Sequence, residues 1–200
     1  MAQQDPTTVL KINSPRSGSV QETQAFLSDM SSAYDRLQCF FVFLDLFGPE
    51  GVKPGRLPDC DDLPFPVHLG PMVRLPIGPM PPDEQIEIKI IRIESPGFWE
   101  FEGAARPLQQ IREYLNDRHG RGQDGSYRER TRQERLALEN KMIQRRMWEL
   151  DASSLADRFS IMTDSGIAES EIRRLVWFNV SQPLIHLGEH QDSLLIQDAQ

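Results

Sequence analysis

The sequence predicts an α+β fold, in which a small antiparallel sheet of two or three strands packs on helices and the C-terminal half is helical. Two apolar-alternating segments that meet at Ser95-Pro96-Gly97 predict a β-hairpin. An amphipathic pattern over 107–118 predicts a helix directly after it, and helical spacing returns throughout 127–200. The length of 200 residues suits one domain with appendages.

The N-terminal region begins with a polar segment. Residues 1–18 contain two prolines, a glycine and several hydroxyl side chains, which predicts a flexible tail. Ser19 and Glu22 have the spacing of a capping box, in which each side chain satisfies an unpaired amide at a helix start. Apolar residues at helical spacing follow, so we expect a helix over 20–37.

The next segment, Cys39–Phe47, is rich in aromatic residues and favours a buried strand. It would supply the third strand of the sheet, because an isolated hairpin is only marginally stable in water. Continuation of the preceding helix is the alternative, since periodicity does not separate short apolar runs. Residues 48–85 contain ten of the fifteen prolines, so we expect a long extended loop there.

The first strand of the hairpin has an irregular pattern. Ile86, Ile88 and Ile90 alternate with charged residues, and the pattern then shifts by one residue to Ile91 and Ile93. Such a shift predicts either a β-bulge or a strand that is buried on both faces.

The turn, the second strand of the hairpin and the helix after it each have a typical sequence signal. The Pro96-Gly97 dipeptide combines a restricted φ with a residue that accepts a positive φ, which predicts a turn. Trp99 and Phe101 then share one face of the second strand. Pro107 suits the first turn of the helix that follows. Residues 19–118 thus make up the predicted α+β domain.

The C-terminal part is predicted to be helical. Residues 119–126 contain three glycines, which predicts a break between the domain and a helical arm. We expect a long helix over 127–150 and two more helices over 154–162 and 167–187.

The helix over 127–150 carries a partial heptad repeat. Placing Ile143 at position d puts Asn140 and Met147 at position a, and the register holds for about two repeats. An asparagine at position a sets the register of a short coiled coil, so the arm is a candidate for self-association.

Charge is distributed unevenly along the chain, whose formal net charge is −8. Residues 106–146 hold 11 basic and 6 acidic residues, and the rest of the chain holds 11 basic and 24 acidic residues. The combination of an acidic body and a basic arm indicates which kinds of partner the chain can bind, and it does not indicate the fold. The residues expected to contact a partner are Arg118, Arg121, Arg128, Arg132, Arg135, Asn140, Ile143, Met147 and Trp148. For Met147 and Trp148 core packing is the other interpretation, and their spacing favours it over an exposed partner-binding stripe.

No motif of the sequence supports catalysis. His186-Leu187-Gly188-Glu189-His190 matches the pattern of inverted zinc proteases, but no acidic ligand of the expected kind follows it. A glycine-rich phosphate loop, a nucleophile elbow and a paired-cysteine motif are all missing from the sequence. We therefore expect a protein that is not an enzyme and needs no metal or cofactor.

The sequence also favours a cytoplasmic protein that does not enter a membrane. The N-terminus lacks the basic and apolar regions of a signal peptide. The longest apolar run, Cys39–Leu44, is far too short to cross a bilayer.

Ser95-Pro96-Gly97 followed by Ile111-Arg112-Glu113-Tyr114-Leu115-Asn116-Asp117-Arg118-His119 resembles a segment of uncharacterised bacterial proteins, which place an S-P-G hairpin before an I-R-x-Y-L-N-D-R-H helix. More distantly, the order strand, hairpin and helix is similar to the N-terminal α/β domain of death-receptor signalling adaptors. Bacterial relatives of that domain are thought to serve in conflict systems. The resemblance implies an adaptor or recruitment module and transfers no catalytic residue.

The expected function is therefore a non-enzymatic protein–protein interaction module, whose partner is another protein or a second copy bound through the helical arm. Nucleic-acid binding by residues 118–146 is the alternative, because arginine forks suit phosphate contacts. It is less favoured because only Tyr127 and Trp148 would be available for base stacking.

Overall fold

The computed structural model describes residues 6–47, 85–150 and 152–200, except for the side chains of residues 128, 148–150, 152 and 153. Within these residues the strands are β1 (Thr7–Ser14), β2 (Glu87–Arg92) and β3 (Gly97–Ala104). The helices are α1 (Val20–Asp45), α2 (Ala105–Gly122), α3 (Gly125–Arg128), α4 (Arg132–Leu150), α5 (Ala152–Asp164), α6 (Glu169–Val176) and α7 (Gln182–Asp192). A π-helical turn, η3 (Trp177–Ser181), joins α6 to α7. A proline-rich loop is predicted over 48–85, and all of it except residue 85 lies outside the described residues.

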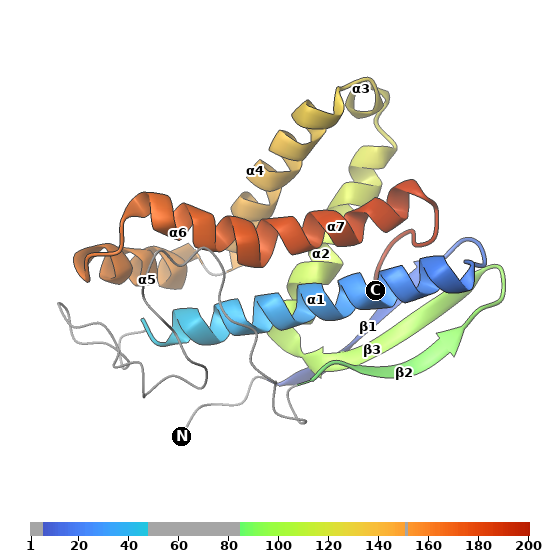
Figure 1. Ribbon diagram of the computed structural model, residues 1–200, viewed down its shortest axis with the longest axis horizontal. Coiled ribbons are helices and arrows are strands. Elements are labelled where there is room, and N and C mark those ends of the chain that lie inside the picture. The colour runs from blue at the N-terminus through green and yellow to red at the C-terminus, as the bar shows by residue number, and fades with distance from the viewer. Residues whose placement is uncertain (1–5, 48–84, 151) are drawn as a thin grey trace.

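The strands form one antiparallel sheet in the order β1-β3-β2, and helices cover one of its faces (Figure 1). This arrangement confirms the predicted α+β class. The predicted bulge is also confirmed, because the register of β2 shifts between Ile88 and Ile90. The turn before β3 requires glycine, since a Cβ at Gly97 would lie 2.2 Å from the carbonyl oxygen of Arg92.

The third strand is β1, so the prediction of a flexible tail is wrong over Thr7–Ser14. Leu10 and Ile12 share one face of the strand and are buried, whereas Val9 belongs to the opposite face and is 52% exposed. This alternation is typical of a strand. Strand β1 is short and polar, so it is stable only through its pairing with β3, in which Ile12 lies opposite Trp99.

The prediction of a strand over Cys39–Phe47 is wrong, and the alternative, continuation of the preceding helix, is confirmed: α1 runs on to Asp45. Phe40, Phe41 and Leu44 are all buried. A helix that is covered on several sides loses its amphipathic pattern, and a short stretch of it then looks like a buried strand.

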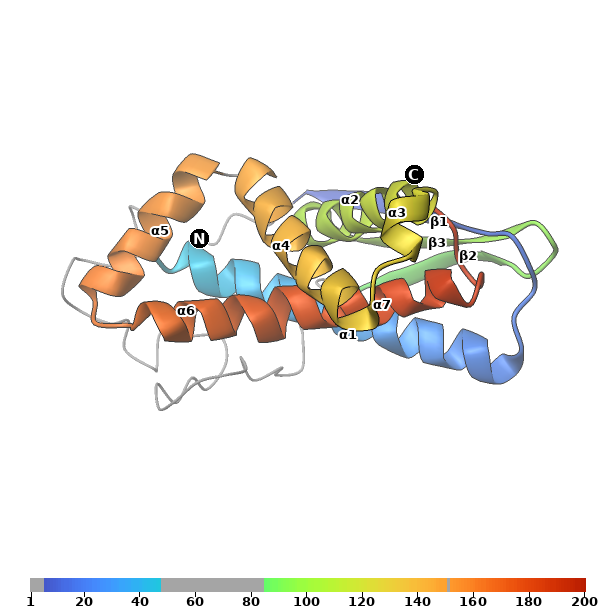
Figure 2. The same cartoon turned by 90° about the horizontal axis from the view of Figure 1, so that it is seen from above.

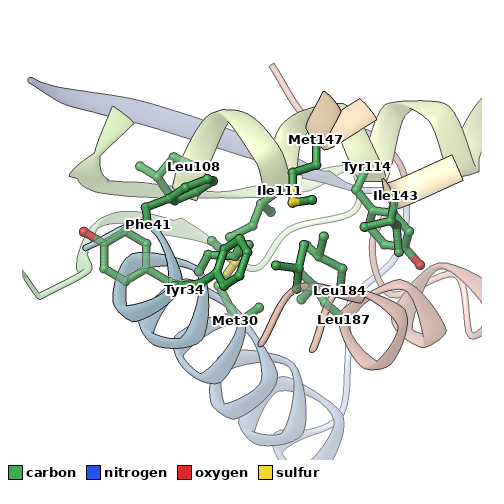
Figure 3. Close-up of a cluster of buried hydrophobic side chains, with 14 of the residues drawn as sticks. Met30, Tyr34, Phe41, Leu108, Ile111, Tyr114, Ile143, Met147, Leu184 and Leu187 are labelled. Carbon is green, nitrogen blue, oxygen red and sulfur yellow. The ribbon is translucent and has the colours of Figure 1, made fainter. Parts of the chain in front are cut away.

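The helices and the sheet share one hydrophobic core. Phe26 of α1 stacks on Trp99 of β3 with ring centroids 4.9 Å apart. Figure 3 shows Tyr34 of α1, Leu108 of α2 and Leu184 of α7 facing the same interior. The Tyr34 hydroxyl also accepts a hydrogen bond from the Ala104 amide at 2.8 Å, which fixes the junction of β3 and α2.

The helix predicted as an arm packs on this core. Ile143 and Met147 of α4 are each 2% exposed and lie in the same cluster as residues of α1 and α2. The break predicted over 119–126 is narrower than expected, because α2 continues to Gly122 and α3 begins at Gly125. In Figure 2, α4 lies beside α2 and crosses α7, and α5 and α6 lie at the end of the molecule opposite the β2–β3 hairpin.

The two outer edges of the sheet differ. Residues 197–200 bond to β1: the amides of Lys11 and Asn13 donate to the carbonyls of Gln200 and Asp198 at 3.0 and 2.9 Å. The outer edge of β2 pairs with no other strand of the described residues. Among the helices that the structure describes, none is long and apolar enough to cross a membrane.

Candidate functional site

A buried ion-pair cluster lies where α2, α4 and α7 meet. The Arg118 side chain is 9% exposed. Its Nε donates to Oε1 of Glu139 at 3.1 Å, and its Nη2 donates to Oδ2 of Asp192 at 2.9 Å. Since a buried charge is costly without its partner, Arg118 holds the three helices in one arrangement.

Two tyrosines complete the surroundings of Glu139. Tyr114 donates its hydroxyl to Oε2 at 3.2 Å, and Tyr127 donates to Oε1. Burial, and then the charge of Glu139, raises the pKa of Tyr114 well above its usual range. Burial and the hydrogen bond to Glu139 raise the pKa of Tyr127 to about 12. Both phenols therefore stay protonated at neutral pH, and with Arg118 they occupy both oxygens of Glu139.

Two cavities flank the Arg118–Asp192 ion pair. The larger has a volume of about 470 Å³ and lies among the ends of α2 and α7, α3, α4 and the C-terminal segment. The smaller, of about 380 Å³, lies between α4 and α7. Arg118, Arg135 and Asp192 line both of them. We name the larger one the arginine cavity; its polar lining includes Arg16, Arg118, His119, Tyr127, Arg135 and Asp192.

Arg135 differs from the other arginines of this cavity. Arg118 is paired with two carboxylates, and Arg16 is paired with Glu22. Arg135 forms no ion pair with a described residue, and its buried Nε has no hydrogen-bond acceptor among them. Glu139 lies one helical turn further along α4, but its oxygens are occupied by Arg118 and the two tyrosines.

The structure brings four of the predicted contact residues to this region. Arg118 lies at its centre, and Arg135 and Arg132 line the cavities. Arg121 lies near enough for its charge to act on Tyr127. Arg132 forms an exposed ion pair with Glu189 of α7 at 3.2 Å.

The other predicted contact residues are dispersed. Ile143 and Met147 belong to the core, so the alternative of core packing holds for Met147. Asn140 is half-buried and accepts a hydrogen bond from Gln144 at 3.1 Å. The side chains of Arg128 and Trp148 lie outside the described part of the chain.

The uneven charge of the sequence has a structural explanation. Three ion pairs join the basic segment to acidic residues of the rest of the chain, Arg106–Asp45, Arg118–Asp192 and Arg132–Glu189. The ion pair of Arg146 with Asp117, at 2.9 Å, lies within the segment itself. Opposite charges from distant parts of the chain thus meet inside one domain. Part of the basic segment therefore pairs with the rest of the molecule.

A second candidate surface is the outer edge of β2. Every residue of β2 is exposed, and Ile88, Ile90 and Ile91 are 46%, 46% and 43% exposed. Sequence reasoning missed this surface because alternating isoleucines normally indicate a buried strand face. It also missed Glu139, for which the sequence offers no signal, although the four-residue spacing of Tyr114 and Arg118 places them on one face of α2.

Comparisons of the chain with protein-family models, with curated proteins and with solved structures find no match. No group of three or more potential metal-ligand side chains occurs within the described residues. His190, from the histidine motif, instead places its Nε2 2.8 Å from Oδ2 of Asp29 on α1.

Proposed function

We propose that this chain is a non-enzymatic protein–protein interaction module, which assembles by pairing β2 with the β2 strand of a second copy. The open edge of the sheet is the observation that supports this most directly. Its outward amides and carbonyls pair with no other strand of the described residues and can bond to another chain, and its exposed isoleucines add apolar area. The resemblance to adaptor domains is in keeping with assembly as a function.

The bulge in β2 determines which pairing registers are allowed. Ile88 precedes the bulge and lies opposite Phe101, and Ile91 follows it and lies opposite Trp99, so both point to the core side of the sheet. Opposite residues of an antiparallel pair must point to the same side. A register that places Ile88 opposite Ile91 of the second copy meets this rule, because the bulge has shifted the usual alternation by one residue.

The same register also matches the charges. With Ile88 opposite Ile91, Glu87 lies opposite Arg92 of the second copy, and two-fold symmetry forms each pair twice. Sliding the strands so that Ile88 faces Ile93 would place Glu87 opposite Glu94, which is a repulsive pair. Charge complementarity therefore favours one register among those that the bulge allows.

Charge reversal tests this register. Glu87→Arg and Arg92→Glu each replace both attractive pairs by repulsive ones, so each variant should associate about tenfold or more weakly than the natural chain. Both side chains are exposed, and their contacts within one chain are surface ion pairs, so folding should be preserved. Sedimentation equilibrium over a wide range of concentration measures the association, and circular dichroism checks the fold.

Mixing the two variants provides the decisive measurement. In a mixed pair, the arginines at 87 and 92 of one chain would face the glutamates of the other, so association should return. The double variant Glu87→Arg/Arg92→Glu should also self-associate. Arg112→Glu, which reverses an exposed charge on α2, is the control and should behave as the natural chain does. A natural chain that stays monomeric, or a mixture that does not associate, contradicts the proposal.

The other candidate surfaces have weaker support. Self-association through α4 would have to expose Ile143 and Met147, which are buried. Nucleic-acid binding would compete with the ion pairs of Arg118, Arg132 and Arg146. A gel shift at low salt that is lost in Arg132→Gln and unaffected by Arg92→Glu would favour nucleic-acid binding instead.

A further inference from the structure

The geometry of the arginine cavity points to a second function: we infer that it binds a small organic phosphate, with Arg135 as the main phosphate ligand. The cavity volume of about 470 Å³ lies within the range of small-molecule sites. It is separate from β2, so this inference does not depend on the assembly that β2 is proposed to form.

Arg135 carries a charge that forms no ion pair with a described residue. A half-buried guanidinium without a carboxylate partner among the described residues is unfavourable, because its buried Nε–H lacks an acceptor there. The same carboxylates that could neutralise it, Glu139 and Asp192, are committed to Arg118. An anion that enters the cavity would therefore meet Arg135, the one arginine of the lining that forms no ion pair with a described residue.

Polar side chains line the cavity together with Arg135. His119 and Gln123 line the cavity and form no hydrogen bond with a described residue through their side chains. A phosphate offers several acceptor oxygens, which suits the planar fork of arginine together with further donors. The donor set is thus better matched by a phosphate than by an apolar ligand.

The cavity also has an apolar rim. Leu194 lines the cavity, is 64% exposed and has a φ of 58°. Glycine or asparagine would adopt this left-handed conformation at lower cost, so the leucine side chain is placed at the rim against its backbone preference. Tyr127 and Ile196 add further apolar surface. A ligand that fits both regions carries a phosphate on an apolar or planar body, as a nucleoside monophosphate does.

Isothermal titration calorimetry with adenosine monophosphate tests the inference. The monophosphate should bind with one site per chain, and adenosine and inorganic phosphate should each bind at least about tenfold more weakly. No binding of the monophosphate at millimolar concentration would overturn the inference. Equal affinity for inorganic phosphate alone would also overturn it, since the apolar rim would then have no role.

Two variants locate the site. Arg135→Gln should weaken binding at least about tenfold, and its melting temperature should not fall, because Arg135 has no ion pair with a described residue to lose. Leu194→Gly should weaken binding and raise the melting temperature. Arg112→Gln removes one exposed arginine of α2 that does not line the cavity, and should bind normally. Unchanged affinity in Arg135→Gln would contradict the assignment.

Discussion

Gly188 lies inside α7, although glycine is among the poorest helix formers. A Cβ at this position would lie 2.3 Å from the Tyr114 hydroxyl and 2.8 Å from Cδ of Arg118. The missing side chain lets α7 approach α2 closely, and this approach allows Arg118 to reach Asp192. The glycine of the histidine motif therefore has a packing role.

Gly188→Ala should lower the free energy of unfolding by about 1–3 kcal/mol, because overpacking against Tyr114 outweighs the better helix propensity of alanine. Gly120→Ala on α2 is the matched control. A Cβ there meets nothing within 4 Å, so the substitution should raise the free energy of unfolding by up to about 1 kcal/mol. Urea unfolding measures both. If Gly188→Ala were as stable as the natural chain, the close contact of α2 and α7 would be disproved.

Among the helices, α1 begins with a capping box formed by its own residues. The Glu22 amide donates to the Ser19 hydroxyl at 3.2 Å, and the Ser19 amide donates to the Glu22 carboxylate at 2.8 Å. The capping box predicted from the sequence is therefore confirmed. Hydrogen bonds from Arg16, and then those from Ser19, lower the pKa of Glu22 to about 2.

This pKa predicts an acid-sensitive helix start. The folded pKa of Glu22 lies below the unfolded value of about 4.3, so its contribution is complete above that value and is lost as the pH falls towards about 2. Glu22→Gln should be less stable than the natural chain near neutral pH and should lose less stability across this window. Urea unfolding between pH 5 and about pH 2 measures the difference.

Arg16→Gln separates the two causes of that shift. It removes the bonds from Arg16 and keeps the capping box, so its acid sensitivity should fall between those of the natural chain and Glu22→Gln. Equal acid sensitivity in all three proteins would show that the capping residues do not stabilise the fold.

At the scale of the whole molecule, the two ends of the described chain are joined through the sheet. The amides of Gln197 and Gln200 donate to the carbonyls of Asn13 and Lys11 at 2.8 and 2.7 Å, in return for the bonds that Lys11 and Asn13 donate. Ala199 lies opposite Ile12 and is nearly buried. In Figure 1 the C-terminus accordingly lies close to β1. The last residues thus pair with one sheet edge, and β2 is the edge that pairs with no other strand in the described part of the chain.

Deletion of residues 197–200 should lower the free energy of unfolding by roughly 2–4 kcal/mol, because it removes four backbone hydrogen bonds. Hydrogen exchange at the amides of Lys11 and Asn13 should become fast in the deletion variant and stay slow in the natural chain. Asp198→Ala is the control, since it removes only the side-chain bond to Asn13. Slow exchange after the deletion would contradict the joined ends.

Much of the local structure could be predicted from the sequence. The α+β class, the start of α1, the bulge and the hairpin turn depend on neighbouring residues, so the spacing of side chains reveals them. Thr7–Ser14 and Cys39–Asp45 could not be assigned in this way. The first is a strand only because β3 pairs with it, and the second is a helix so deeply covered that its pattern disappears.

The candidate sites, like the fold, could be predicted from the sequence only in part. The sequence alone determined that arginines of 118–135 belong to a basic segment and that isoleucines alternate along β2. Only the tertiary structure decided which arginine of the cavity lining forms no ion pair with a described residue and which isoleucines are exposed. The reason is physical: pairing and burial depend on partners such as Glu139 and Asp192, which are distant in the chain and meet Arg118 only when the helices pack.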